Sequence, residues 1–171
     1  MPTAKQLLVT QLTQSFEGRK DMPLMGVLAD ISDEQAGWQS TATTPSIDQL
    51  VRHIAWSASV YCRDGFGTPM VAEDPGVSAE GDTEGIPWEF PCGSGFGRTS
   101  HPGIAGAIDL LRRSQATMLG CLEALPDEAL DRPIPNRHGR TAAHFFWIMI
   151  MHNLYHAGQI RTRRTMHSPR G

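Results

Sequence analysis

The chain of 171 residues lacks the features that define several common classes of protein. Its three cysteines, Cys62, Cys92 and Cys121, are an odd number without a CxxC pair, which argues against a disulfide scaffold and a thiolate zinc knuckle. The longest apolar run, residues 145–151, is far shorter than the roughly 20 residues that span a bilayer. No apolar stretch typical of a secretory signal follows Met1. We therefore expect a soluble, cytoplasmic protein without a membrane partner.

Positive charge is also scarce. Lysine and arginine number 15 against 18 aspartates and glutamates, so the formal net charge is −3 with histidine counted as neutral. A domain that binds nucleic acid by electrostatic attraction normally has a basic excess, so we expect no nucleic-acid partner. The length fits a single domain over residues 1–171. The unusual abundance is histidine, with seven residues whose side chains suit metal binding or proton transfer.

Four segments have apolar residues spaced three to four apart, as on one face of a helix, and no segment alternates as a strand would. The four segments are 4–16, 46–63, 102–125 and 141–164. After the first of them, residues 24–31 again show apolar residues at a helical spacing. A capping box, Ser46 to Gln49, starts the second helix, and Thr141 is the expected N-cap of the fourth. These patterns predict an all-α, up-and-down four-helix bundle. Because residues 145–151 are apolar around the whole helix, this segment should be central or covered by a partner subunit.

The composition changes sharply between the second and third helices. Residues 64–97 contain eight glycines, four prolines and seven carboxylates, and they contain no lysine or arginine. Such a segment should not form a regular element, so we predict an irregular Gly/Pro/acid-rich insertion over residues 66–100. Residues 73–85 should form a solvated acidic loop. The aromatic residues within 86–96 suggest that this part folds back over the bundle, where it could cover a pocket.

Three of the histidines have a spacing suited to metal binding. His152 and His156 are four residues apart on a helical segment and therefore project from one face. His53 lies on or near the buried stripe of the second helix. If the second and fourth helices pack side by side, the three imidazoles can hold one divalent ion and leave coordination positions open. The alternative is that His152 and His156 cap the helix or face solvent, and that His53 is a hydrogen-bonded core residue.

Other metal centres do not fit this sequence. A ferritin-like di-iron bundle requires Glu-x-x-His on two helices, and none of the eight glutamates has a histidine three residues later. There is no carboxylate from Thr141 onward. The metalloprotease motif HExxH is absent because Asn153 follows His152. A mononuclear, histidine-rich site is the form that remains.

The string from His152 to Ile160 resembles the H-x-x-Y-H-x-G-Q-[IL] signature of the DinB/YfiT-like superfamily. The string from Ser46 to Ala55 is similar to the segment that carries the first metal histidine in that superfamily. The resemblance covers roughly residues 5–63 and 102–164. It implies a four-helix bundle, often a homodimer, that binds zinc or nickel through the positions of His53, His152 and His156.

The resemblance also bears on activity, because some relatives are thiol-dependent transferases or isomerases that use bacillithiol, mycothiol or glutathione. The chain is thus expected to be a metal-dependent enzyme of thiol-transferase or hydrolase type. Its expected partners are a small-molecule substrate and a low-molecular-weight thiol as cosubstrate. No catalytic side chain is assigned, since no convergent Ser/His/Asp set or carboxylate pair is evident. The alternative is a non-catalytic, metal-binding or ligand-sensing dimeric bundle.

Several further residues near this motif have two possible roles. His144 either lines the same cavity or stabilises the first turn of its helix, and we favour the second role. Gln159 either orients a ligand histidine or a substrate, or caps the helix end. Tyr155 is expected to pack at a helix interface. Three histidines should lie exposed in loops or at the tail: His101, His138 and His167.

The cysteines are expected to stay outside the metal site. Cys62 lies nine residues after His53, half a turn out of phase, and should point away from the metal. Cys121 should be an inert core residue of the third helix. Cys92 lies in the insertion and is given no catalytic role.

Overall fold

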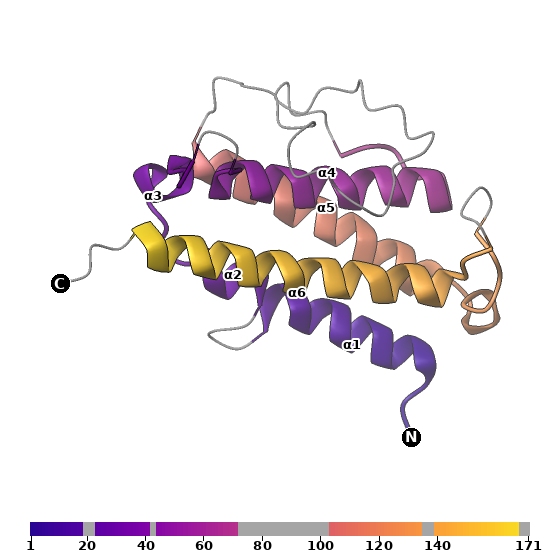
Figure 1. The fold of residues 1–171 in the computed structure, drawn as a ribbon. Coiled ribbons are helices and arrows are strands. Elements are labelled where there is room, and N and C mark those ends of the chain that lie inside the picture. The colour runs from indigo at the N-terminus through magenta and orange to yellow at the C-terminus, as the bar shows by residue number, and fades with distance from the viewer. Residues whose placement is uncertain (19–22, 42–43, 72–102, 135–138, 168–171) are drawn as a thin grey trace.

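A computed structural model describes residues 1–18, 23–41, 44–71, 103–134 and 139–167 (Figure 1). Within these ranges every regular element is a helix, which confirms the predicted all-α class. The elements are α1 (Ala4–Glu17), α2 (Leu24–Val27), α3 (Asp33–Gly37), α4 (Ile47–Phe66), α5 (Ile104–Ala124), the 3-10 turn η1 (Asp127–Ala129) and α6 (Ala142–His167). The segment 24–31 is helical only as far as Val27, and α6 extends beyond the predicted end at residue 164.

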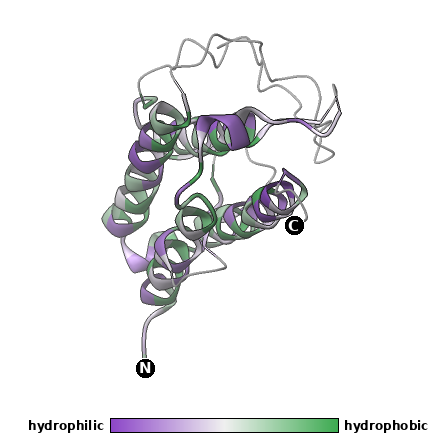
Figure 2. Cartoon of the chain, turned by 90° about the vertical axis from the view of Figure 1, so that its left-hand side faces the viewer, coloured by the Kyte–Doolittle hydropathy of each residue, from purple (hydrophilic) through white to green (hydrophobic). Residues whose placement is uncertain are grey.

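The four long helices form a bundle. Helix α4 packs against α5 on one side and α6 on the other, and α1 contacts α5 and α6 on the far side (Figure 1). Figure 2 shows hydrophobic and hydrophilic residues interleaved along each helix, as expected for helices that bury one face. No helix in the described part of the chain is both long and apolar enough to cross a membrane.

Contacts near the helix ends reveal the directions of the helices. Lys5, near the start of α1, donates to the carbonyl of Leu125 just after the end of α5, with an Nζ to O distance of 2.5 Å. Asp33 in α3, the short helix that precedes α4, contacts the first residue of α5, Ile104. Helices α4 and α5 therefore begin at the same end of the bundle and run in the same direction (Figure 1).

The all-α bundle is as predicted, but the parallel direction of α4 and α5 departs from an up-and-down order, in which each long helix reverses the direction of the one before. A helix of 20 residues such as α4 is about 30 Å long. The chain must cover that length again before α5 begins, which takes about nine extended residues. The connection, residues 67–103, is much longer than this minimum. A long connection between the second and third long helices is thus a requirement of the topology.

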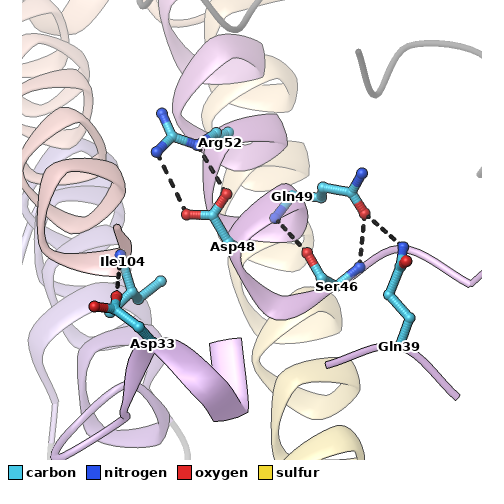
Figure 3. Close-up of polar contacts among 7 residues, drawn as sticks. All are labelled: Asp33, Gln39, Ser46, Asp48, Gln49, Arg52 and Ile104. Carbon is cyan, nitrogen blue, oxygen red and sulfur yellow. Dashed lines mark hydrogen bonds and ion pairs between the residues drawn. The ribbon is translucent and has the colours of Figure 1, made fainter. Parts of the chain in front are cut away.

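Side-chain caps position α4 and α5 (Figure 3). The predicted capping box is confirmed, since Ser46 Oγ accepts from the Gln49 amide at 3.2 Å and Gln49 Oε1 accepts from the Ser46 amide at 2.8 Å. Asp33 Oδ1 accepts from the amide of Ile104 at 2.8 Å and so satisfies the first N–H of α5. Thr141 Oγ1 accepts from the amide of His144 at 3.2 Å, as expected of an N-cap.

The end of α4 corrects the predicted start of the insertion. Phe66 still belongs to the helix, and its ring stacks on Phe146 with the centroids 5.3 Å apart. Gly67 then takes a left-handed conformation with φ of 68°, which terminates the helix in the manner typical of glycine. The irregular segment therefore begins after Phe66. Residues 72–102, with Cys92, His101 and the predicted lid segment 86–96, lie outside the described residues, as does His138.

The apolar run in α6 is buried on one side only. Phe146 and Met149 are almost completely buried in the bundle, whereas Trp147 is 54% exposed and Met151 is 46% exposed. Tyr155, at 60% exposure, continues the exposed side one turn later. Within a single chain, other helices therefore do not cover the whole circumference of α6 at residues 145–151, as a central helix would require. The expectation that Tyr155 packs at a helix interface is likewise wrong within the chain.

A polar layer crosses the core beside the end of this run. Asn153 is fully buried, and its Nδ2 donates to Ser15 Oγ at 3.2 Å and to Gln115 Oε1 at 3.3 Å. Gln115 Nε2 donates in return to Asn153 Oδ1 at 3.2 Å. The layer joins α1, α5 and α6, and mutual pairing satisfies amides that would otherwise be costly to bury.

Candidate metal centre

His53, His152 and His156 come together between α4 and α6. Nε2 of His152 lies 3.3 Å from Nε2 of His53 and 3.1 Å from Nε2 of His156. One ring nitrogen from each of the three lies within 4.8 Å of the others. The structure therefore brings together the three histidines selected from the sequence. His152 and His156 contact each other instead of capping the helix or facing solvent. The contact of His53 with His152 also fits the alternative of a hydrogen-bonded residue, so metal binding by the three stays a prediction.

Two features of the chain create this convergence. The four-residue spacing on α6 stacks His152 and His156 one turn apart, with their ring centroids separated by 4.4 Å. The packing of α6 against α4 then brings His53 to both rings, with centroid distances of 5.3 Å to His152 and 5.0 Å to His156. His156 is buried, and the other two are half-buried.

The nitrogen spacing suits a first-row metal ion. Two imidazole nitrogens bound tetrahedrally at about 2.05 Å from zinc would lie about 3.4 Å apart. The observed distances of 3.1 and 3.3 Å are close to that value. Three histidine ligands would leave at least one coordination position for another ligand, as in catalytic zinc sites.

The protonation states are also suitable. Burial, and to a smaller extent the proximity of His156, lowers the pKa of His53 from 6.5 to about 4. Burial, followed by the two neighbouring histidines, lowers the pKa of His152 well below its usual value. Burial likewise lowers the pKa of His156 to about 4, against the opposing effect of its hydrogen bond to Gln159. The neutral imidazoles that metal binding requires are therefore the resting forms at pH 7.

Gln159 determines the tautomer of His156. Its Oε1 lies 2.8 Å from Nδ1 of His156, and its Nε2 donates to the Tyr155 hydroxyl at 2.9 Å. Because the carbonyl oxygen can only accept, Nδ1 of His156 must be the protonated nitrogen and Nε2 presents its lone pair to the cluster. Of the two roles expected for Gln159, orienting a histidine is observed. Helix capping is not, since α6 continues to His167.

Arg163 is a residue whose role the sequence analysis did not identify. Its positive charge contributes to the lowered pKa of His156. It follows His156 by seven residues, two turns along the same face of α6. This seven-residue spacing is the signal that the sequence offers for Arg163.

Other histidines lie apart from the cluster. His144 is exposed at the start of α6, which agrees with the favoured role in the first turn. The prediction that His167 is an exposed tail residue is wrong. Only 19% of its side chain is exposed, and its ring lies edge-on to Trp38 with the centroids 5.7 Å apart. The reason is that α6 extends far enough to place His167 against the residues that follow α3.

Two of the cysteines lie on the adjacent helices α4 and α5. Cys62 is completely buried on α4, and Cys121 is half-buried on α5 and packs against the cluster that contains Cys62, Phe145 and Phe146. That Cys62 points away from the metal and that Cys121 is inert stay predictions.

Comparisons with known proteins agree with the fold and the motif. A family model described as the DinB superfamily matches residues 21–160. A crystal structure of a conserved protein from Enterococcus faecalis is similar over 97% of this chain and 98% of its own, with a TM-score of 0.74 and 16% sequence identity. At this identity the likeness concerns the fold alone. No curated protein matches the chain with significance.

Proposed function

The chain belongs to the DinB superfamily, and we propose that His53, His152 and His156 hold one divalent metal ion, zinc or nickel. The observation that carries this proposal is the convergence of three imidazole nitrogens within 4.8 Å. The low pKa values of the histidines and the fixed tautomer of His156 support it, because both keep nitrogen lone pairs available.

The charge of the site favours an anion as the additional ligand. Three neutral imidazoles leave the full double charge of the ion uncompensated, and the metal-binding cluster among the described residues contains no carboxylate. Arg163 adds positive charge near His156. When bound, a divalent ion would stabilise a thiolate or hydroxide at neutral pH. A low-molecular-weight thiol has the appropriate chemistry for this position.

We therefore infer a metal-dependent enzyme of thiol-transferase or hydrolase type that acts on a small molecule. The protein groups would have supporting roles: the histidines fix the ion, Gln159 orients His156, and Arg163 attracts a negatively charged group. No side chain is assigned as a general base. Thiol transfer is favoured over hydrolysis because a thiolate is already a strong nucleophile when formed and needs no such base.

Spectroscopy of the cobalt-loaded protein tests this proposal. Co²⁺ adopts coordination geometries similar to those of Zn²⁺. It absorbs in the near ultraviolet when a thiolate binds it. A low-molecular-weight thiol added to the Co²⁺-loaded protein should produce this charge-transfer band, and the band should be absent in His152→Ala. Tight metal binding without any response to thiols would instead favour the non-catalytic or sensing alternative. Failure to bind one metal ion would contradict the proposal itself.

The exposed stripe of α6 supports a homodimer as part of this proposal. Trp147, Met151 and Tyr155 are spaced by four residues and are 46% to 60% exposed, so they form one apolar strip on the surface. A second copy of the chain would bury this strip, which a monomer would leave in water. Sedimentation analysis should show a dimer for the native chain and a monomer for Trp147→Glu. A monomeric native chain would contradict the dimer.

A further inference from the structure

Tyr155 is linked to the proposed metal site although it lies on the surface. It is 60% exposed, whereas His156, the next residue in the chain, is buried. Its hydroxyl accepts a hydrogen bond from Nε2 of Gln159 at 2.9 Å, and Oε1 of the same amide lies 2.8 Å from Nδ1 of His156. The rings of Tyr155 and His156 also meet edge to face, with the centroids 5.1 Å apart. A surface hydroxyl is therefore two hydrogen bonds away from a proposed metal ligand.

The geometry of one helix produces this arrangement. Gln159 follows His156 by three residues and Tyr155 by four, and both spacings place side chains on one face of α6. Side chains in a helix lean toward its N-terminus, so the Gln159 amide reaches back over the preceding turn, where both partners lie. These two hydrogen bonds thus need no residue from another helix.

The hydroxyl of Tyr155 restrains a side chain that has many rotamers. Glutamine loses much conformational freedom when it is fixed in one of them. Gln159 is only half-buried, so water can compete for its amide. With Nε2 bound to Tyr155, the amide is held at both ends. The position of Oε1 against His156 therefore depends in part on Tyr155.

The polarity of these two bonds matters for metal binding. Because the amide nitrogen can only donate, the Tyr155 oxygen is the acceptor, and its own proton remains available to water at the exposed surface. Oε1 then faces His156, whose proton lies on Nδ1. In the reverse polarity the hydroxyl would donate to Oε1 and the amide to Nδ1. The imidazole proton would then occupy Nε2, the atom that a metal ion needs.

We propose that Tyr155 is a positioning residue of the metal site, whose hydroxyl holds the Gln159 amide so that His156 keeps its proton on Nδ1 and its Nε2 lone pair for the ion. This inference rests on the proposed function, because it requires that His156 binds a metal. Tyr155 offers the ion no ligand of its own and acts through Gln159. The exposed side of α6 is thereby connected to the buried histidines.

Tyr155→Phe tests this role in the full chain, because phenylalanine keeps the ring and its apolar surface and removes only the hydroxyl. The affinity for Zn²⁺, measured by competition with a chromogenic chelator, should fall about 2–10-fold, the contribution of one hydrogen bond. In a Gln159→Leu background the same substitution should cause no further loss, since Tyr155 acts through Gln159. Tyr61→Phe is the matched control. It removes the hydroxyl of the other tyrosine, which lies on α4 outside the histidine cluster, and should leave the affinity unchanged.

NMR of the imidazole nitrogens in the metal-free protein provides a second readout. The Nδ1–H and Nε2–H tautomers of histidine give different nitrogen chemical shifts. His156 should be protonated at Nδ1 in the native chain and in Tyr61→Phe, and should become a mixture of the two tautomers in Tyr155→Phe. A purely structural role of Tyr155 would lower the stability of the fold without changing the tautomer.

Three results would overturn the proposal: unchanged Zn²⁺ affinity in Tyr155→Phe, a loss that adds in full to that of Gln159→Leu, and protonation of His156 at Nε2 in the metal-free native chain. All three are compatible with a native chain that binds one ion, so the proposed function would stand. A native chain that binds no metal would instead refute the proposed function, and with it the role of Tyr155. Circular dichroism of each variant establishes that the bundle is folded.

Discussion

Gln159 Oε1 lies 2.8 Å from Nδ1 of His156, and this contact directs the other ring nitrogen of His156 toward His152 and His53. The proposed metal site therefore depends on a residue that does not itself belong to the histidine cluster. Partners of this kind typically change metal affinity by about 10–100-fold when they are removed.

Substitution of Gln159 separates this orienting role from a structural one. Gln159→Leu should weaken metal binding by about 10–100-fold, because Nδ1 of His156 loses its acceptor and the lone pair is no longer fixed. Gln159→Glu retains an acceptor and should keep near-native affinity. Competition with a chromogenic chelator measures both. Equal affinity in the native and Leu variants would show that Gln159 does not orient His156.

The lowered pKa values predict a pH dependence for the metal-free protein. Between pH 6.5 and about 4 the unfolded chain binds protons on His53 and His156, whereas the folded chain does not. The unfolded state thus gains protons as the pH falls, and the free energy of unfolding should decrease across this interval. The loss is on the order of 3 kcal/mol for each histidine. Urea denaturation in the presence of a chelator, at a series of pH values, measures this effect.

A double substitution provides the control for the pH dependence. His53→Asn with His156→Asn should remove the part of the slope between pH 6.5 and 4 that these two histidines contribute, since asparagine does not titrate, and the part contributed by His152 should remain. The native chain and the double variant should then approach each other in stability at low pH. An unchanged slope in the double variant would assign the pH dependence to other groups.

The buried pair of Asn153 and Gln115 predicts that substitution of Asn153, the neighbour of His152 in the sequence, lowers the free energy of unfolding substantially. Asn153→Ala leaves the Gln115 side chain without its partner and should cost about 1–3 kcal/mol of unfolding free energy from the unpaired group alone. Combining it with Gln115→Leu removes the unpaired amide and should recover part of the loss. Thermal unfolding of the single and double variants measures the coupling. Strictly additive losses would indicate that the two amides do not act as a pair.

The local signals in the sequence were sufficient for the helices and their caps. The box from Ser46 to Gln49 and the cap at Thr141 depend on residues within one turn of each other, and both occur as predicted. The spacing of His152 and His156 likewise depends on a single helix. Such short-range features can be read directly because helix geometry alone relates the residues.

Features that depend on how two helices pack against each other could not be predicted from the sequence. The periodicity of α4 and α5 contains no information on direction, so their parallel packing was not predicted. His167 lies three residues beyond the predicted end of the last helix at residue 164, and its packing on Trp38 depends on these added residues. The sequence predicted that His53 approaches His152 and His156 only if the second and fourth helices pack side by side, and the sequence alone could not establish that packing.

The most direct test of the proposed metal centre is the metal content of single variants after loading with Zn²⁺ and removal of excess ion. His144→Ala is the matched control, because His144 is an exposed histidine on the same helix and outside the cluster. The account predicts one ion per chain in the native protein and in His144→Ala, and little or none in His53→Ala, His152→Ala and His156→Ala. Retention of one tightly bound ion in all three cluster variants would contradict it.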